Sequence, residues 1–193
     1  DRVNYSSGSP LEDVMGYSRM VKTGPFIFIG GTTSVLPDGS VAGEGNADAQ
    51  DDFILDKQIK LLEEAGASSS DIIMMKKYVT PGCHLCRGAG SAVWAENFGA
   101  ITPVCTEVPV TRLNRPAQLE EIELAAIPGS GGTELRSEWG MFDFRRTPSP
   151  AGIVKAGPVV YCGGTQALSE SGEAMYADDA LKQESCTMEK TFR

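Results

Sequence analysis

The stretch that decides the fold is KTGPFIFIGGT, residues Lys22 to Thr32, because a closely similar stretch, KAGPVVYCGGT, occupies residues 155–165. Residue numbers 22 and 155 differ by 133, and the same offset joins other identical pairs without a gap. Such pairs include Gly24/Gly157, Pro25/Pro158, Gly31/Gly164, Gly39/Gly172, Gln50/Gln183 and Lys57/Lys190. This offset is the size of a whole domain and is too long for a solenoid repeat. The sequence therefore predicts one complete domain followed by the first half of a second copy.

Hydrophobic periodicity predicts the elements of the first copy. Residues 48–65 carry an apolar stripe at helical spacing and end before Gly66, which predicts a helix with a glycine cap. A shorter helix is predicted over residues 89–98. Short runs rich in apolar and β-branched residues predict strands at 17–23, 26–30, 72–80, 106–110 and 121–127. The order β-β-α-β-α-β-β predicts an α+β fold with two helices on one face of a sheet.

The repeat divides the chain. We expect residues 154–162 to form a hairpin like 21–29, and residues 180–192 to begin a helix. The predicted divisions are a loosely held extension at 1–14, a complete domain at 15–127, a linker at 128–149 and a partial second repeat at 150–193. Residues 137–146 contain several aromatic side chains, which fit either a packed connector or a lid.

Half of a domain cannot bury its apolar strands alone. We therefore expect a homo-oligomer, either a trimer or a pseudo-trimer, or a complex with the remainder of a cleaved tandem chain. Exposed strand edges invite such pairing.

Composition narrows the possible partners. The chain carries 26 acidic and 17 basic residues, a net charge of −9, which opposes sequence-independent binding to nucleic acid. No apolar run approaches the roughly 18 residues of a membrane span, and the first residues lack a signal-peptide pattern. We therefore expect a cytoplasmic protein that contacts neither nucleic acid nor membrane.

The five cysteines, an odd number, are expected to be reduced thiols. Cys83, His84 and Cys86 have the spacing of half a zinc site, but a structural zinc site needs four ligands and His84 is the single histidine. We therefore expect no metal site.

Three stretches together resemble the Rid family, also called YjgF-type or endoribonuclease L-PSP proteins. They are GYSRMVKTGPFIFIGGT at 16–32, WAENFGAITPVCTEVPV at 94–110 and LEEIELAAI at 119–127. The resemblance covers about residues 15–127, and the second copy resembles the first half of another such domain. It implies a chorismate-mutase-like fold, ligand clefts between subunits, and hydrolysis of small amino-acid-derived imines to keto acids and ammonia without metal or cofactor.

The resemblance also implies a set of site residues. The glutamate that positions water falls on Glu121, and the tyrosine before the first strand falls on Tyr17. The serine–glycine pair falls on Gly30 and Gly31. Cys105 stands in place of the arginine that grips the substrate carboxylate, and Ser91 stands in place of an asparagine, which departs from the family pattern. A thiol cannot replace the bidentate guanidinium fork.

Each of these residues also has a structural interpretation. Glu121 fits either a water-orienting acid/base or a surface glutamate, and Cys105 fits either a nucleophile or a small buried thiol. Arg19 shares one face with Tyr17 if this stretch is extended, so Arg19 is either a displaced carboxylate-binding cation or an exposed surface arginine. The sequence favours a deaminase-like hydrolase of a reactive imine or related metabolite, with a non-catalytic binding or assembly module as the alternative and a nuclease as the least favoured class.

Overall fold

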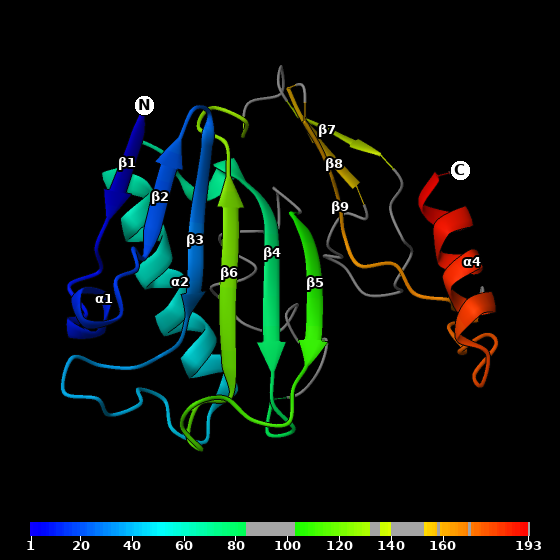
Figure 1. The fold of residues 1–193 in the computed structure, drawn as a ribbon, viewed down its shortest axis with the longest axis horizontal. Helices are drawn as coiled ribbons and strands as arrows, with labels where there is room; N and C mark the ends of the chain where they lie inside the picture. The colour runs from blue at the N-terminus through cyan, green and yellow to red at the C-terminus, as the bar shows by residue number, and fades with distance from the viewer. Residues whose placement is uncertain (84–102, 132–135, 140–152, 158, 170, 193) are drawn as a thin grey trace.

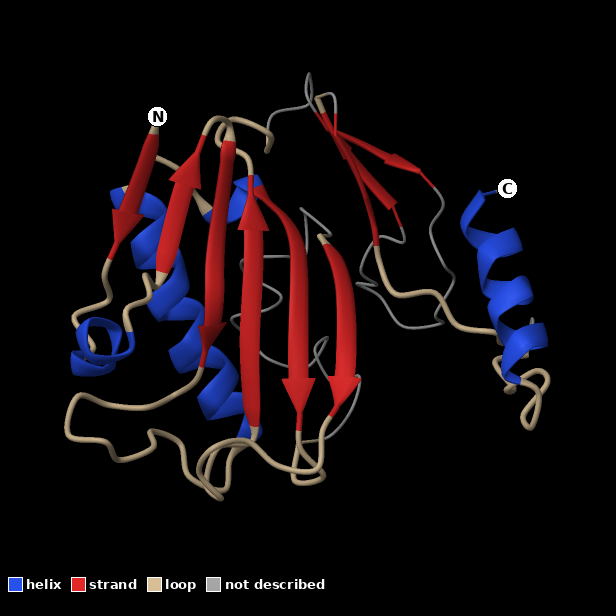
Figure 2. Cartoon of the chain, viewed as in Figure 1, coloured by secondary structure: helices blue, strands red, loops and turns tan. Residues whose placement is uncertain are grey.

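The protein is described by a computed structural model that covers residues 1–83, 103–131, 136–139, 153–157, 159–169 and 171–192. Within these residues the strands form a six-stranded sheet of order β1-β2-β3-β6-β4-β5 and a three-stranded sheet of order β7-β8-β9 (Figures 1 and 2). The helices are α1 (Pro10–Met15), α2 (Ala47–Glu64), the 3-10 turn η1 (Ser69–Asp71) and α4 (Ala180–Phe192). The strands of the large sheet are β1 (Arg2–Tyr5), β2 (Met20–Thr23), β3 (Phe26–Thr32), β4 (Ile72–Val79), β5 (Val104–Pro109) and β6 (Glu120–Ala126). The small sheet contains β7 (Arg136–Trp139), β8 (Ile153–Ala156) and β9 (Val159–Cys162).

The predicted strands of the first domain and its long helix are confirmed, apart from shifts of a few residues at their ends. The helix predicted over residues 89–98 lies outside the described residues, as does most of the aromatic connector. The prediction of a loosely held start is wrong, because β1 pairs antiparallel with β2 from Arg2↔Thr23 to Tyr5↔Met20. The sequence gives little sign of β1, since an edge strand is held by backbone hydrogen bonds and needs no apolar face.

Helix α2 packs on one face of the large sheet and builds the main core. The Asn46 side chain caps the helix by accepting a hydrogen bond from the backbone N–H of Ala49 at 3.2 Å. The buried side of α2 meets the alternate apolar residues of β3, β4 and β6. This core contains Ile27, Ile29, Ile54, Leu55, Leu61, Leu62, Met75, Ile122 and Leu124. None of the helices in the described part of the chain is long and apolar enough to cross a membrane.

A β-bulge interrupts the pairing of β3 with β6. Ile29 lies opposite Leu124, and Thr32 lies opposite Ile122, so β3 carries one residue more than β6 between these pairs. The extra length falls on Gly30 and Gly31. Bulges of this kind commonly redirect a strand beside a functional site.

Several local contacts of the C-terminal part lie 133 residues after similar contacts in the first part. The predicted hairpin is confirmed, because β8 pairs antiparallel with β9. Isolated bridges join Val35 to Val41 and, at the same offset, Leu168 to Ala174. The backbone N–H of Gln50 bonds to the carbonyl of Asn46, and that of Gln183 bonds to Asp179. Gly43 has a φ of 67°, and Tyr176 at the same offset has a φ of 55°.

The hairpin β8–β9 covers part of the large sheet on the face opposite α2. Val154 and Ala156 of β8 are buried in a second core with Ile73, Val104 and Ala125 of the large sheet. The remaining members are Ile127 and the partly buried Phe26, Met74, Val159 and Tyr161. One face of the hairpin is therefore already used for packing.

Candidate functional site

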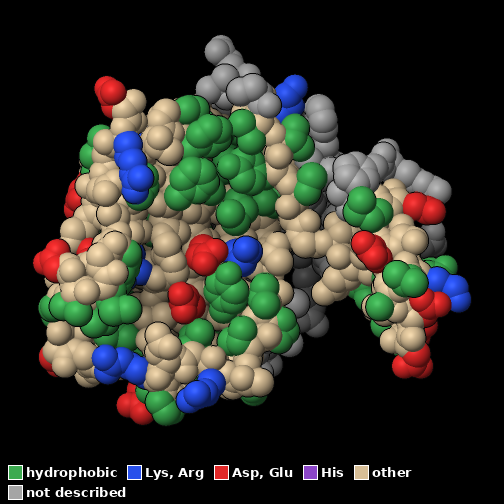
Figure 3. All heavy atoms as spheres, viewed as in Figure 1, with side chains coloured by type: hydrophobic (Ala, Val, Ile, Leu, Met, Phe, Trp, Pro, Cys, Tyr) green, Lys and Arg blue, Asp and Glu red, His purple; other side chains and the backbone are tan. Residues whose placement is uncertain are grey.

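The candidate site lies on the sheet face opposite α2, where Glu121 of β6 meets the bulge of β3. A Cβ atom added at Gly31 would lie 1.8 Å from Glu121 Oε1, so the carboxylate occupies the space that the glycine leaves open. Figure 3 shows this face, with acidic and basic side chains beside apolar ones. The sheet therefore places the Glu121 carboxylate directly against the half-buried backbone of Gly31.

Arg19 joins the elements around this carboxylate. The guanidinium donates from Nη2 to the Tyr17 hydroxyl at 2.8 Å and from Nη1 to the carbonyl of Gly31, and its carbon lies 5.1 Å from the centre of the Tyr17 ring. Tyr17 and Arg19 therefore share one side of the chain, as predicted. We call Tyr17, Arg19, Gly31 and Glu121 the Glu121 cluster.

Arg19 already has a carboxylate partner, which is Glu12 of α1. Arg19 Nε lies 3.3 Å from Glu12 Oε1, and the two side chains are 11% and 3% exposed. Burial alone would raise the pKa of Glu12, but hydrogen bonds from Ser6, Ser7 and Arg19 outweigh it and hold that pKa below its usual value. Arg19 is therefore not an exposed surface arginine, and most of its donors are used inside the protein.

The pKa of Glu121 is raised from its ordinary value. Burial is the largest cause, repulsion by the Glu123 carboxylate adds to it, and the charge of Arg19 opposes both. A carboxyl group whose pKa is raised in this way can exchange protons closer to neutral pH than a free glutamate does.

The structure separates Cys105 from this cluster. In the parallel pairing of β4 with β5, Cys105 lies opposite Met75, and its side chain packs against the core on the α2 side. Glu121 lies on the other face of the sheet. Gly30 is in the bulge, where its N–H bonds to the carbonyl of Arg19 at 2.9 Å. Ser91 lies outside the described residues.

We expect Gly31→Ala to move the Glu121 carboxylate out of its position, because the new methyl group would overlap it. The displaced atoms end a flexible side chain, so the free energy of unfolding should fall by only about 1 kcal/mol. Gly30→Ala is the matched control, since the nearest atom to its new Cβ is the Arg19 carbonyl oxygen at 3.7 Å. Crystal structures of both variants check this prediction. Glu121 unmoved in the Gly31 variant, or displaced equally in both, would contradict it.

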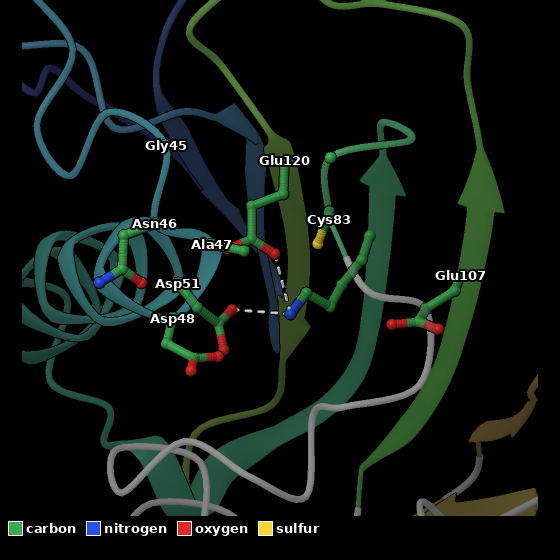
Figure 4. A pocket seen from close by; sticks show the side chains of 10 residues that line it. Gly45, Asn46, Ala47, Asp48, Asp51, Cys83, Glu107 and Glu120 are labelled. Atoms are coloured by element: carbon green, nitrogen blue, oxygen red, sulfur yellow. Dashed lines mark hydrogen bonds and ion pairs between the residues drawn. The ribbon is translucent and has the colours of Figure 1, made fainter.

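A second polar cluster lies on the opposite side of the sheet, between α2 and β4. Lys77 Nζ lies 2.7 Å from Asp51 Oδ1 and 3.0 Å from Glu120 Oε2, and all three side chains are buried (Figure 4). We call these three residues the Lys77 cluster. Apart from Lys77, no donor of the described residues bonds to either Glu120 oxygen, so the ion pair with Lys77 is what compensates this buried carboxylate.

The Lys77 cluster stands at the floor of a cavity of about 310 Å³ beside the start of α2. Burial would lower the pKa of Lys77, but the charges of Asp51 and Glu120 outweigh burial and raise it, so the amine stays protonated and cannot act as a nucleophile. Burial, with repulsion by Asp51, raises the pKa of Glu120 to about 7 against the attraction of Lys77. Burial likewise raises the pKa of the Cys83 thiol to about 11, which leaves it unreactive.

No group of three or more His, Cys, Asp and Glu side chains in the described part of the chain is placed to hold a metal ion. Of the half zinc site, Cys83 is described, whereas His84 and Cys86 lie outside the described residues.

Sequence reasoning missed Glu12 and the Lys77 cluster. Glu12 stands in a polar stretch without an apolar period, so the sequence does not show that Ser6, Ser7 and Arg19 surround its carboxylate. The sequence does carry a signal for the Lys77 cluster. In a strand, alternate residues face the same side, so Lys77 shares a face with the buried Met75 and Val79. A charged residue at such a position predicts a buried partner of opposite sign.

A family model, curated relatives and solved structures all relate this chain to the same family. Residues 8–128 match the family model described as endoribonuclease L-PSP. RutC family proteins of Pyrococcus abyssi and Pyrococcus horikoshii are 29% and 30% identical over 104 residues, which cover 54% of this chain and 80% and 81% of theirs. A YjgF/YER057c/UK114 family structure from Mycobacterium tuberculosis is 34% identical with a TM-score of 0.55, covering 66% of this chain and 99% of that one. The structure of a putative endoribonuclease from Thermotoga maritima shares the fold with a TM-score of 0.52. The two chains are 24% identical, and the match covers 64% of this chain and 91% of that one.

Proposed function

Because this chain belongs to the endoribonuclease L-PSP family, which is also known as the YjgF or Rid family, we propose that it binds a small metabolite at the Glu121 cluster and hydrolyses a reactive imine or related electrophile there. The observation that carries this proposal is the position of Glu121 Oε1 in the space left open by Gly31. A carboxylate fixed against a glycine backbone can hold a water molecule beside a planar ligand.

One carboxylate carries every proton transfer. Glu121 accepts a proton from water while the water oxygen bonds to the carbon of the protonated imine, whose carbon–nitrogen π electrons pass to nitrogen, and a neutral carbinolamine forms. The carboxylic acid then returns the proton to nitrogen. As the carbon–nitrogen bond breaks, the carboxylate accepts the proton of the carbinolamine hydroxyl, the carbonyl compound leaves, and ammonia departs with this proton as ammonium. The Tyr17 hydroxyl, which accepts a hydrogen bond from Arg19, has its own hydrogen available for the ligand.

The ion pair between Arg19 and Glu12 limits how well this site can bind a substrate that carries a carboxylate. A substrate carboxylate would have to share this guanidinium with Glu12, and Cys105 lies on the other face of the sheet. A missing charge-assisted hydrogen bond costs about 1.5–3 kcal/mol, or about tenfold to over a hundredfold in binding. We therefore propose that 2-iminopropanoate is a poor substrate and that the preferred imine relies less on a free carboxylate.

The same occupancy of Arg19 favours the second candidate, a binding or assembly module without turnover. Soaking crystals with keto acids tests both candidates for a ligand beside Glu121 and Gly31. Release of ammonia from imines generated in solution then separates them. Ligand in the cleft with no ammonia would select the binding module, and neither ligand nor ammonia would exclude both.

We further propose that residues 15–127 form one complete domain and that residues 150–193, joined by a linker at 128–149, belong to a second copy. Recurrence of the hairpin, the isolated bridge and the helix start at one offset supports this organisation. The hairpin β8–β9 packs on the large sheet face to face, as a neighbouring subunit could. This packing fits a homo-oligomer, a pseudo-trimer or a complex with further Rid-type strands. We also propose a cytoplasmic location.

The pH dependence of hydrolysis should report the titration of Glu121. The active form is the carboxylate, and its folded pKa is raised, so the rate should increase as pH rises through a midpoint above 4.5. Glu123→Gln removes a repelling charge and should shift that midpoint to lower pH. A pH–rate profile of both proteins checks the shift. An unchanged or higher midpoint in the variant would show that another group controls the rate.

A further inference from the structure

The cavity above the Lys77 cluster carries more negative than positive charge. Its walls come from the start of α2, from β4, β5 and β6, and from the turn after β4. Among the described residues, its charged lining consists of Lys77 and the carboxyl groups of Asp48, Asp51, Glu107 and Glu120 (Figure 4). The amino end of α2 adds only about half a positive charge. Four carboxyl groups outweigh these positive charges, so the cavity favours a cation over an anion.

One carboxylate oxygen of this lining has no hydrogen-bond partner. Glu120 is 1% exposed, and its Oε2 lies 3.0 Å from Lys77 Nζ. Its other oxygen, Oε1, is buried and accepts no hydrogen bond from the described residues. In Figure 4 the Glu120 side chain points from β6 toward Asp51, across the cavity. A buried acceptor of this kind is stabilised by any donor that enters the cavity beside it.

The cavity also limits the size of its ligand. A volume of about 310 Å³ lies at the lower end of the range for small-molecule sites, so a compact ligand fits best. The acidic lining runs from the interior to the surface, because Glu120 is buried whereas Asp48 is exposed. A short chain with a donor at each end can therefore meet an acceptor at each end of the cavity.

We propose that this cavity binds a small aliphatic amine in its protonated form, with the ammonium group donating a hydrogen bond to Glu120 Oε1. Lys77 holds the Glu120 side chain through Oε2 and leaves Oε1 for the ligand. A second ammonium group on the same chain faces Asp48 at the surface, which makes a short diamine the best probe. Glu120 and Glu121 are successive residues of β6 and face opposite sides of the sheet, so this inference does not depend on the proposed hydrolysis.

The test is isothermal titration calorimetry of the full chain at pH 8 with butane-1,4-diamine, butane-1,4-diol and succinate. These probes share a four-carbon chain and differ in the charge of their ends, so the comparison isolates charge. A constant ionic strength keeps screening equal in the three titrations. We expect saturable binding of the diamine at one site, and binding of the diol and of succinate that is at least tenfold weaker.

Variants locate the binding site. Glu120→Gln keeps the shape of the side chain, removes its charge and should weaken diamine binding at least tenfold. Glu63→Gln makes the same change on the exposed surface of α2 and should leave binding unchanged. Glu121→Gln should also bind the diamine normally, which separates failure here from failure of the proposed hydrolysis. If Glu120→Gln does not fold, Asp48→Asn at the exposed end of the cavity should weaken binding instead.

The pH dependence of binding is a further readout of Glu120. Burial raises the pKa of Glu120 to about 7, Lys77 opposes this shift, and the charges of Asp51 and Glu107 add to it. The Cys83 thiol, which also lines the cavity, has a pKa of about 11 and keeps its proton. An ammonium ligand prefers the carboxylate, so its affinity should rise between pH 6 and pH 8, and this rise should be lost in Glu120→Gln.

Three results would overturn the proposal. The first is the absence of saturable diamine binding, and the second is equal affinity for the diamine and the diol. The third is an affinity that Glu120→Gln leaves unchanged while Glu121→Gln weakens it, because the amine would then bind on the other face of the sheet.

Discussion

Lys77→Met should reduce the free energy of unfolding by about 3–5 kcal/mol. The substitution removes the cation that lies 2.7 Å from Asp51 Oδ1 and 3.0 Å from Glu120 Oε2. Methionine fills a similar volume, so the loss comes from two buried carboxylates that are left without a compensating charge. Urea unfolding at pH 8 measures the difference. The deficit should shrink as the solution is acidified, because burial raises the pKa of Glu120 to about 7 and protonation removes the charge of this carboxyl group.

Two controls separate this charge effect from a packing defect. Lys60→Met breaks an exposed ion pair with Asp56, whose side chains are 68% and 63% exposed, and should cost about 0.5 kcal/mol or less. The triple variant Asp51→Leu, Lys77→Met, Glu120→Leu removes all three charges and should be close to the original stability or above it. A cost below about 1 kcal/mol for Lys77→Met alone would contradict the buried network.

Glu121→Gln should lower the rate of imine hydrolysis by about 10²–10⁴-fold while leaving the fold intact. Glutamine keeps the shape of the side chain against Gly31, but it cannot accept the proton of the attacking water. Binding of a keto acid should change much less, because the amide still fills the same space. Circular dichroism and the unfolding midpoint provide the control for the fold.

The strands and α2 could be predicted because their apolar periods agree with the packing they enter. Phe26–Thr32 and Ile72–Val79 alternate in burial along most of their lengths, so local pattern and tertiary structure give the same answer. The order of strands could not be predicted in this way. Strand β6 lies between β3 and β4, and β5 runs parallel to β4, and these pairings depend on long connections.

The candidate site was predictable only through the family resemblance. That resemblance named Tyr17 and Glu121, and in the structure Tyr17 bonds to Arg19 while Glu121 lies against Gly31. It could not reveal that Glu12 already pairs with Arg19, because this contact joins α1 to the segment before β2. It also could not show on which face Cys105 lies, since β5 begins at Val104 rather than at the predicted Thr106.

The most direct test of the central claim is the rate at which amino-acid-derived imines disappear in the presence of the protein. An amino acid oxidase generates the imines in solution, and semicarbazide traps whatever remains. The account predicts that the protein accelerates the decay of at least one imine, that 2-iminopropanoate is among the slower substrates, and that Glu121→Gln removes the acceleration. Equal decay with and without the protein for every imine tested, or equal rates for the protein and its Glu121→Gln variant, would contradict it.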